Sequence, residues 1–142
     1  MRALLDVNVL IALLDADHLH HVRAREWLLE NAHSGWASCP ITQNGCIRVM
    51  SQQGYPNPLP IAAVADRLAK ATRHPGHEFW PDDVTLLDPR VADPRRMHGP
   101  KQVTDLYLLA LSVTNKGRLA TFDETIPLSA IRGATRKRLA II

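Results

Sequence analysis

The sequence lacks several features that would assign it to a specialised class of protein. Only 2 of its 142 residues are cysteine, and no Cys-x-x-Cys pair occurs, which excludes a disulfide scaffold and gives no support to a zinc knuckle. We expect both Cys39 and Cys46 to be buried. No apolar run reaches the ~18 residues of a membrane span. The aromatic content of 5% is too low to indicate a dedicated surface for stacking bases.

Two motifs of phosphate chemistry are also absent. The phosphate-binding loop Gly-x-x-x-x-Gly-Lys-Ser/Thr does not occur, which argues against a P-loop nucleoside triphosphatase. A haloacid-dehalogenase phosphatase would need a second aspartate two residues after Asp6, where Asn8 stands. These same two polar residues interrupt the N-terminal apolar stretch, and no small-residue cleavage site follows it. We therefore expect a first strand of a cytoplasmic protein rather than a signal peptide, and no membrane association.

The composition is that of one globular domain, which we expect to span residues 1–142. Hydrophobic residues make up 46% and charged residues 22%, which excludes a disordered chain. The charge is uneven: residues 1–89 carry 7 basic and 10 acidic side chains, whereas residues 90–142 carry 10 basic and 4 acidic ones. A basic segment of this kind suits a phosphate backbone or an acidic partner, and it equally suits a solvated surface.

Hydrophobic periodicity predicts strands that alternate with helices. We expect strands over residues 2–6, 36–39, 78–80, 118–122 and 140–142, and helices over residues 8–14, 19–32, 41–51, 60–73 and 103–115. Asn8 is the expected N-cap of the first helix. The expected inner face of the second helix consists of Leu19, Val22, Trp27 and Leu28 or Leu29. The alternation indicates an α/β fold with a mostly parallel sheet, in which ligands bind beyond the carboxyl ends of the strands.

Three aspartates are expected to meet at that edge. Asp6 ends the first strand, Asp123 follows the strand at 118–122, and Asp105 lies at the start of the apolar helix. Their like charges would repel one another and raise their pKa values unless a cation lay among them. Carboxylate oxygens suit Mg²⁺ or Mn²⁺, and such an ion would activate a water molecule and neutralise a phosphoryl oxygen.

Each aspartate also has an ordinary structural explanation. Asp105 follows Thr104 and would serve simply to begin a helix, while Asp123 would serve as a turn residue. Asp6 would accept a hydrogen bond from a neighbouring loop amide. A carboxylate at the end of a Leu-Leu strand is nevertheless costly unless it is paired. The pattern alone leaves both interpretations open.

The segments that carry these aspartates resemble the signatures of a known family. Leu-Leu-Asp6-Val-Asn8-Val-Leu, Val-Thr104-Asp105-Leu-Tyr-Leu-Leu-Ala-Leu and Leu-Ala-Thr121-Phe-Asp123 look like the three motifs of PIN-domain ribonucleases. The similarity is greatest to the VapC toxins of VapBC type II toxin–antitoxin systems. Two further segments resemble that subgroup, Asp-His18-Leu-His-His21 and Trp36-Ala-Ser-Cys-Pro-Ile-Thr42-Gln43-Asn44-Gly45-Cys-Ile-Arg48-Val. Together the motifs cover essentially the whole chain.

The resemblance implies a fold, an activity and a set of roles. The fold would be a three-layer α/β/α sandwich with a four- to five-stranded, mostly parallel sheet. The activity would be endonucleolytic cleavage of RNA by a water molecule bound to Mg²⁺ or Mn²⁺, with Asp6, Asp105 and Asp123 as the metal ligands. Further residues would orient these carboxylates, namely Asn8, Thr121 and Thr104.

One position departs from the family pattern. Family members usually carry a glutamate on the helix after the second strand, and Gln43 stands at the matching position. Glutamine keeps the shape and one carbonyl oxygen but loses the charge, so we expect a second metal ion to be weakened more than the first. We count Gln43 among the catalytic candidates. The alternative is a PIN-fold protein that binds RNA and antitoxin with weakened or lost nuclease activity. Glu124 would be a replacement charge or an exposed turn residue.

Other polar residues near these motifs have less defined roles. Arg48 would contact phosphate, pair with a site carboxylate or form a surface salt bridge. The spacing of His18, His20 and His21 forms no convincing zinc site, so we expect a structural role or contact with RNA. The resemblance also implies a VapB-type antitoxin, a homodimer with an exposed apolar patch on an early pair of helices, and an RNA substrate such as tRNA or rRNA.

Overall fold

A five-stranded parallel sheet forms the centre of the molecule. The computed structural model describes residues 1–142. The strands lie in the order β3-β2-β1-β4-β5, and every neighbouring pair is parallel. Their bounds are β1 (Ala3–Leu5), β2 (Trp36–Ser38), β3 (His77–Phe79), β4 (Arg118–Thr121) and β5 (Leu139–Ile141). The expected α/β class and parallel sheet are therefore confirmed.

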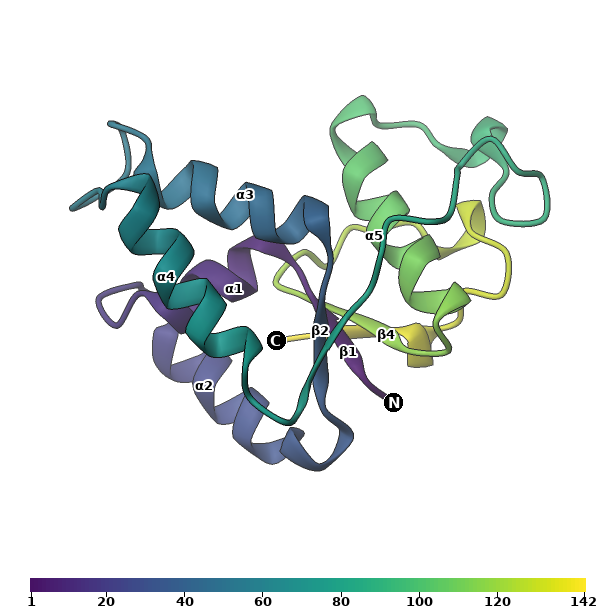
Figure 1. The fold of residues 1–142 in the computed structure, drawn as a ribbon. Coiled ribbons are helices and arrows are strands. Elements are labelled where there is room, and N and C mark those ends of the chain that lie inside the picture. Colours follow the sequence, from purple (N-terminus) through teal and green to yellow (C-terminus); the bar gives the residue numbers. More distant parts are fainter.

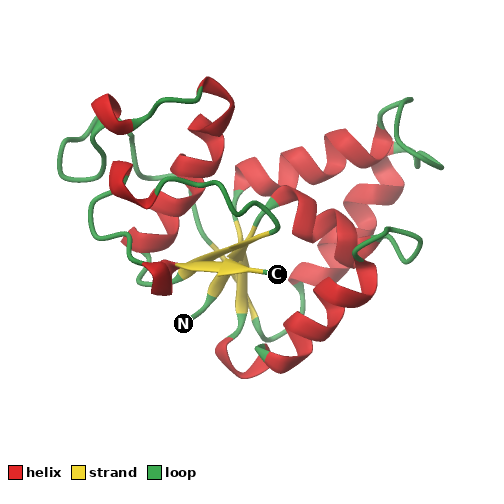
Figure 2. Ribbon diagram, turned by 180° about the vertical axis from the view of Figure 1, so that it is seen from behind, coloured by secondary structure: helices red, strands yellow, loops and turns green.

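Helices cover both faces of this sheet. They are α1 (Val7–Leu14), α2 (His21–Glu30), α3 (Pro40–Ser51), α4 (Ile61–Thr72) and α5 (Val103–Thr114). In Figure 1, α1 to α4 gather on one side of the sheet and α5 lies on the other, and the reverse view in Figure 2 shows the same three layers. No helix has the length and apolar character needed to cross a membrane.

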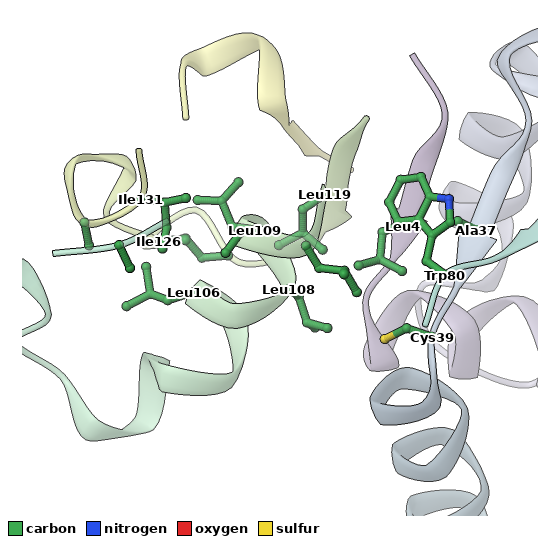
Figure 3. Packing of buried hydrophobic residues seen from close by; sticks show 14 residues of the cluster. Leu4, Ala37, Cys39, Trp80, Leu106, Leu108, Leu109, Leu119, Ile126 and Ile131 are labelled. Atoms are coloured by element: carbon green, nitrogen blue, oxygen red, sulfur yellow. The ribbon is translucent and has the colours of Figure 1, made fainter. Parts of the chain in front are cut away.

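The alternation of side chains along β1 divides the core in two. Leu4 faces the layer of α5, where it joins Leu108, Leu119 and Trp80 in one buried cluster (Figure 3). Leu5 faces the opposite layer and packs in a second cluster with residues of α1, α3 and α4. Because both faces of β1 are buried, any polar group at its end needs an internal partner. Cys39 and Cys46 are buried and unbonded to each other, as expected.

The first two helices differ from expectation in ways that matter for the site. The N-cap of α1 is Asp6, not Asn8, because the helix already begins at Val7 and the carboxylate of Asp6 accepts from the Val7 amide. Helix α2 begins at His21, and its one buried residue is Ala24. Leu19 and Val22 are 89% and 64% exposed, so the expected inner face was wrong for these two.

Candidate active site

Asp6 lies at the carboxyl end of β1 and is almost fully buried, with 7% of its surface exposed. Its Oδ1 accepts a hydrogen bond from the Val7 amide at 2.7 Å, and its Oδ2 accepts from the Thr121 hydroxyl at 2.8 Å. Burial raises the pKa of Asp6, and the negative charge of Asp123 adds to this, while the two hydrogen bonds oppose the rise. The carboxylate is thus fixed in orientation by groups from β4 and α1.

Thr121 also ties Asp123 to the site. The strands β1 and β4 pair with Leu5 beside Ala120, so Asp6 and Thr121 lie side by side at the sheet edge. The Thr121 hydroxyl donates to Asp6 and accepts from the Asp123 amide at 3.1 Å. The Asp123 Oδ1 accepts from both the amide and the hydroxyl of Thr125, at 2.7 and 2.6 Å. The turn role weighed for Asp123 is therefore real, and it coexists with a place at the acidic edge.

Asp105 enters from the opposite layer, on the first turn of α5. Its carboxylate has no hydrogen bond within the protein. Burial and the negative charges of Asp6 and Asp123 raise its pKa from an ordinary value of 3.8 to about 6. The electrostatic effect of both partners means that the three carboxylates share one neighbourhood, as the strand-end argument predicts. None of the three forms an ion pair with a lysine or arginine.

The chemistry of this donor set fits a hard divalent cation. Three carboxylates that repel one another and have no lysine or arginine partner are stabilised by such an ion. Carboxylate oxygens are also its preferred ligands. The side chains as they stand do not form a closed group of three ligands around one point. Thr125 holds one oxygen of Asp123, and Asp105 projects from a separate helix, so side-chain movement would be needed to complete a coordination shell.

Comparison with known proteins decides the family. The PIN domain family model matches residues 3–131. Ribonuclease VapC44 of Mycobacterium tuberculosis (strain ATCC 25618 / H37Rv) is 56% identical over 142 residues, covering 100% of both chains. From the same strain, Ribonuclease VapC39 is 42% identical over 135 residues (94% of this chain, 96% of the relative), and Ribonuclease VapC38 is 46% identical over 125 residues (85% and 84%).

The chain belongs to the VapC family of PIN-domain ribonucleases. It is accordingly an endoribonuclease and the toxin component of a type II toxin–antitoxin system, and the expected PIN-like fold is confirmed. PIN-domain ribonucleases generally depend on a divalent metal ion, and VapC enzymes act on RNA and have a cognate VapB antitoxin. No comparison favours the alternative of a VapC-like protein that only binds.

In this VapC chain, Gln43 lies on the first turn of α3 and points to the end of β2. Its Nε2 donates to the Ser38 hydroxyl at 2.9 Å, and that hydroxyl lies 2.8 Å from His77 Nε2 on β3. Ser38 is fully buried, so Gln43 supplies one of its few possible partners. No hydrogen bond joins Gln43 to an aspartate. Sequence reasoning missed Ser38 and His77, although a serine inside the buried segment Trp-Ala-Ser-Cys was a visible signal.

Close packing brings α3 to the acidic edge. A Cβ atom at Gly45 would lie 2.7 Å from the nearer methyl carbon of Val7, so only glycine permits this approach of α3 to the start of α1. Since Val7 directly follows Asp6, the contact sets the distance between the helix that carries Gln43 and the first carboxylate. A larger residue at position 45 would push the two apart.

The remaining candidate residues lie outside this hydrogen-bond network. Asn8 and Thr104 are exposed and form no side-chain hydrogen bond. Arg48 is exposed without an ion pair and lines a shallow hollow with Ile47 and Ile61. Glu124 lines another hollow together with Arg136. Of the residues expected to support the acids, only Thr121 contacts one of them directly.

Proposed function

We propose that Asp6, Asp105 and Asp123 form the metal-binding catalytic centre of this VapC ribonuclease. The observation that supports it is the unneutralised negative charge at this one sheet edge, where burial and, after it, the charges of Asp6 and Asp123 raise the pKa of Asp105 to about 6. Carboxylates held in this way favour occupation by a cation over occupation by three free anions. The ion would be Mg²⁺ or Mn²⁺, both of which prefer oxygen ligands.

Different residues of the chain would have different roles in such a centre. When bound, the ion supplies a water molecule of lowered pKa and neutralises charge on a phosphoryl oxygen. Thr121 and the Val7 amide fix the orientation of Asp6, so that its carboxylate need not reorganise during the reaction. Gln43, held by Ser38, places a neutral amide on the α3 side of the site, where the family usually has a negative charge.

The family also suggests the kind of RNA that is cleaved and the partners of the protein. We propose that folded RNA such as tRNA or rRNA is cleaved in a single-stranded loop, in the cytoplasm, and that the VapB-type antitoxin inhibits this cleavage. A homodimer remains a prediction from the family resemblance. The exposed Val22 and Leu29 of α2 give an early helix the apolar surface that such an interface needs, and light scattering of the purified chain would test it.

The decisive experiment is cleavage of a labelled pool of tRNA and rRNA by the purified chain. Reactions containing Mg²⁺, Mn²⁺ or EDTA would be compared for the wild type, Asp6→Ala and Gln43→Glu. Asp66→Ala, which changes an exposed carboxylate on α4, is the matched control. We expect metal-dependent cuts by the wild type and the control and none by Asp6→Ala. Cleavage that survives in Asp6→Ala would contradict the proposed centre. Activity confined to Gln43→Glu would favour the binding-only alternative.

A further inference from the structure

A cationic and aromatic cluster borders the acidic edge on the side of α2. The His20 ring lies 4.9 Å from the Phe122 ring, centroid to centroid, and is tilted by 41° to it. The guanidinium carbon of Arg23 lies 5.0 Å from the centre of the same Phe122 ring. The loop between α1 and α2 and the first turn of α2 thus meet the residue that follows β4.

Phe122 places this cluster beside the proposed metal ligands. It lies between Thr121, whose hydroxyl donates to Asp6, and Asp123. Along the chain, side chains beyond a strand end continue to alternate, so Phe122 packs on the α1 side of the sheet while Thr121 faces Asp6. Arg23 and His20 therefore contact the residue between Thr121 and Asp123, and neither forms an ion pair with Asp6, Asp105 or Asp123.

The polar groups of this cluster have few partners inside the protein. Arg23 is exposed, forms no ion pair with an aspartate or glutamate, and, besides lying over the Phe122 ring, donates to the main-chain oxygen of Ile142. The His20 ring has no hydrogen bond. Another histidine and another arginine, by contrast, are held by partners within the protein. His21 Nδ1 lies 2.7 Å from the Ala12 carbonyl oxygen, and the Arg118 guanidinium donates to Asn31 and lies over Trp27.

The loop between α1 and α2 carries two carboxylates, of which Asp17 is exposed and forms no side-chain hydrogen bond, while Asp15 is engaged. Asp15 accepts from the Tyr55 hydroxyl and from the Asp17 amide, which holds it on the α1 side. It acts on His18, whose ring lies 5.7 Å from that of His20. Burial lowers the pKa of His18, and the neighbouring His20 adds to this.

We propose that Arg23 and His20 form a phosphate-binding subsite for the RNA strand, adjoining the acidic centre on the β4 side. A polyanionic substrate must approach carboxylates that repel it, and donors on a flank of the centre offset that repulsion. A guanidinium presents a planar set of N–H donors to phosphate oxygens, and Phe122 holds it in place by a cation–π contact. This inference rests on the proposed function for its meaning, but RNA binding can be measured without cleavage.

The test is the affinity of metal-free protein in EDTA for a fluorescently labelled single-stranded RNA of mixed sequence. Arg23→Ala and His20→Gln would be compared with Arg25→Ala, which removes the same charge from the same helix but from a residue that lines the apolar hollow beside Leu28. We expect Arg23→Ala to weaken binding roughly tenfold and to reduce the slope of log affinity against log salt by about 1. His20→Gln should weaken it a few-fold, and Arg25→Ala should leave it unchanged.

Arg23→Lys is a control that separates the loss of the charge from a loss of folding, because it retains the positive charge near Phe122. We expect it to keep the salt slope and to recover part of the affinity, with an unchanged thermal unfolding curve. In the cleavage assay, Arg23→Ala should raise KM and leave kcat close to that of the wild type. Equal affinities for Arg23→Ala and Arg25→Ala, or a loss of kcat with KM unchanged, would overturn the subsite.

The two proposals fail in different ways. If Asp6→Ala cleaves RNA normally while Arg23→Ala binds it weakly, the metal centre is wrong and the subsite stands. If Asp6→Ala is inactive but binds RNA like the wild type, and Arg23→Ala also binds like the wild type, the centre stands and the subsite is overturned.

Discussion

The two sides of the acidic centre are built in different ways. On the strand side, one hydroxyl joins two aspartates: Thr121 donates to Asp6 at 2.8 Å and accepts from the Asp123 amide at 3.1 Å. On the helix side, Asp105 on α5 has no hydrogen bond, and Gln43 on α3 bonds to Ser38 instead of a carboxylate. The strand side is fixed by the fold, whereas the helix side is left to be organised by what binds.

This difference separates two requirements of a nuclease. A fixed carboxylate lowers the cost of reorganisation when charge develops in the reaction. The pKa of Asp105 is instead raised, first by burial and then by the negative charges of Asp6 and Asp123, so a bound cation would stabilise its charged form. Mutations on the strand side should therefore affect catalysis most, and mutations on the helix side should affect mainly the response to metal and pH.

Removing the charge of Asp6 should have the largest effect. Asp6→Asn keeps an oxygen that can cap α1, so the fold should survive, but it removes the most firmly held carboxylate of the site. We expect RNA cleavage to fall by on the order of 10³-fold, which corresponds to a loss of several kcal/mol of transition-state stabilisation. The measurement is the initial rate with Mg²⁺, alongside circular dichroism. A properly folded variant with near-normal rates would show that the strand side is not where catalysis resides.

Thr121 should come next, because it is the link between the two strand-side aspartates. Thr121→Val keeps the shape but leaves Asp6 Oδ2 and the Asp123 amide each without this partner. We expect about 10- to 100-fold weaker metal-dependent activity, the usual size of effect for a residue that orients a ligand. Unfolding should also become easier by about 1–3 kcal/mol, because a buried acceptor loses its donor. Thr121→Ser, which retains the hydroxyl, should restore most of both.

The same contrast explains what could be read from the sequence. The strand side was predictable, since Asp6 and Asp123 each follow a short apolar run and parallel strands end at one edge. The cap of α1 was not, because Asp6 and Asn8 are both good capping residues and the sequence does not decide after which of them the helix begins.

The helix side was harder to read, because its contacts depend on tertiary packing. Gln43 turns to Ser38, five residues before it, and Ser38 also lies against the His77 ring of β3, a neighbour that only the β2–β3 pairing reveals. The exposure of Leu19 and Val22 also escaped periodicity, because α2 begins later than its apolar pattern suggests and buries only Ala24.

Asp105→Asn removes a proposed metal ligand, and in the absence of metal we expect a smaller effect that is seen in stability. Its folded pKa of about 6 lies above its ordinary 3.8, so the folded state binds the proton more tightly than the unfolded state does. The stability that this group contributes is therefore full below about pH 4 and is lost as the pH rises through about 6. In EDTA, Asp105→Asn should melt with the wild type at pH 4 and a few degrees above it at pH 7.5. Mg²⁺ should raise the melting temperature of the wild type more than that of the variant. A constant difference at all pH values would contradict the proposed charge repulsion.

Restoring a negative charge at position 43 should have the smallest effect and is the sharpest test of the helix side. In Gln43→Glu, the carboxylate can accept a hydrogen bond from the Ser38 hydroxyl in place of the amide donation seen here, so the fold should hold. We expect Mg²⁺ or Mn²⁺ to bind a few-fold more tightly, with at most a modest rise in cleavage at saturating metal, since the proposed centre would already hold the first ion with three aspartates. Calorimetric titration with metal, compared between Gln43→Glu and Gln43→Met, separates the effect of charge from that of shape. Unchanged metal affinity in Gln43→Glu would mean that position 43 serves Ser38 and the α3–β2 contact rather than the acidic centre.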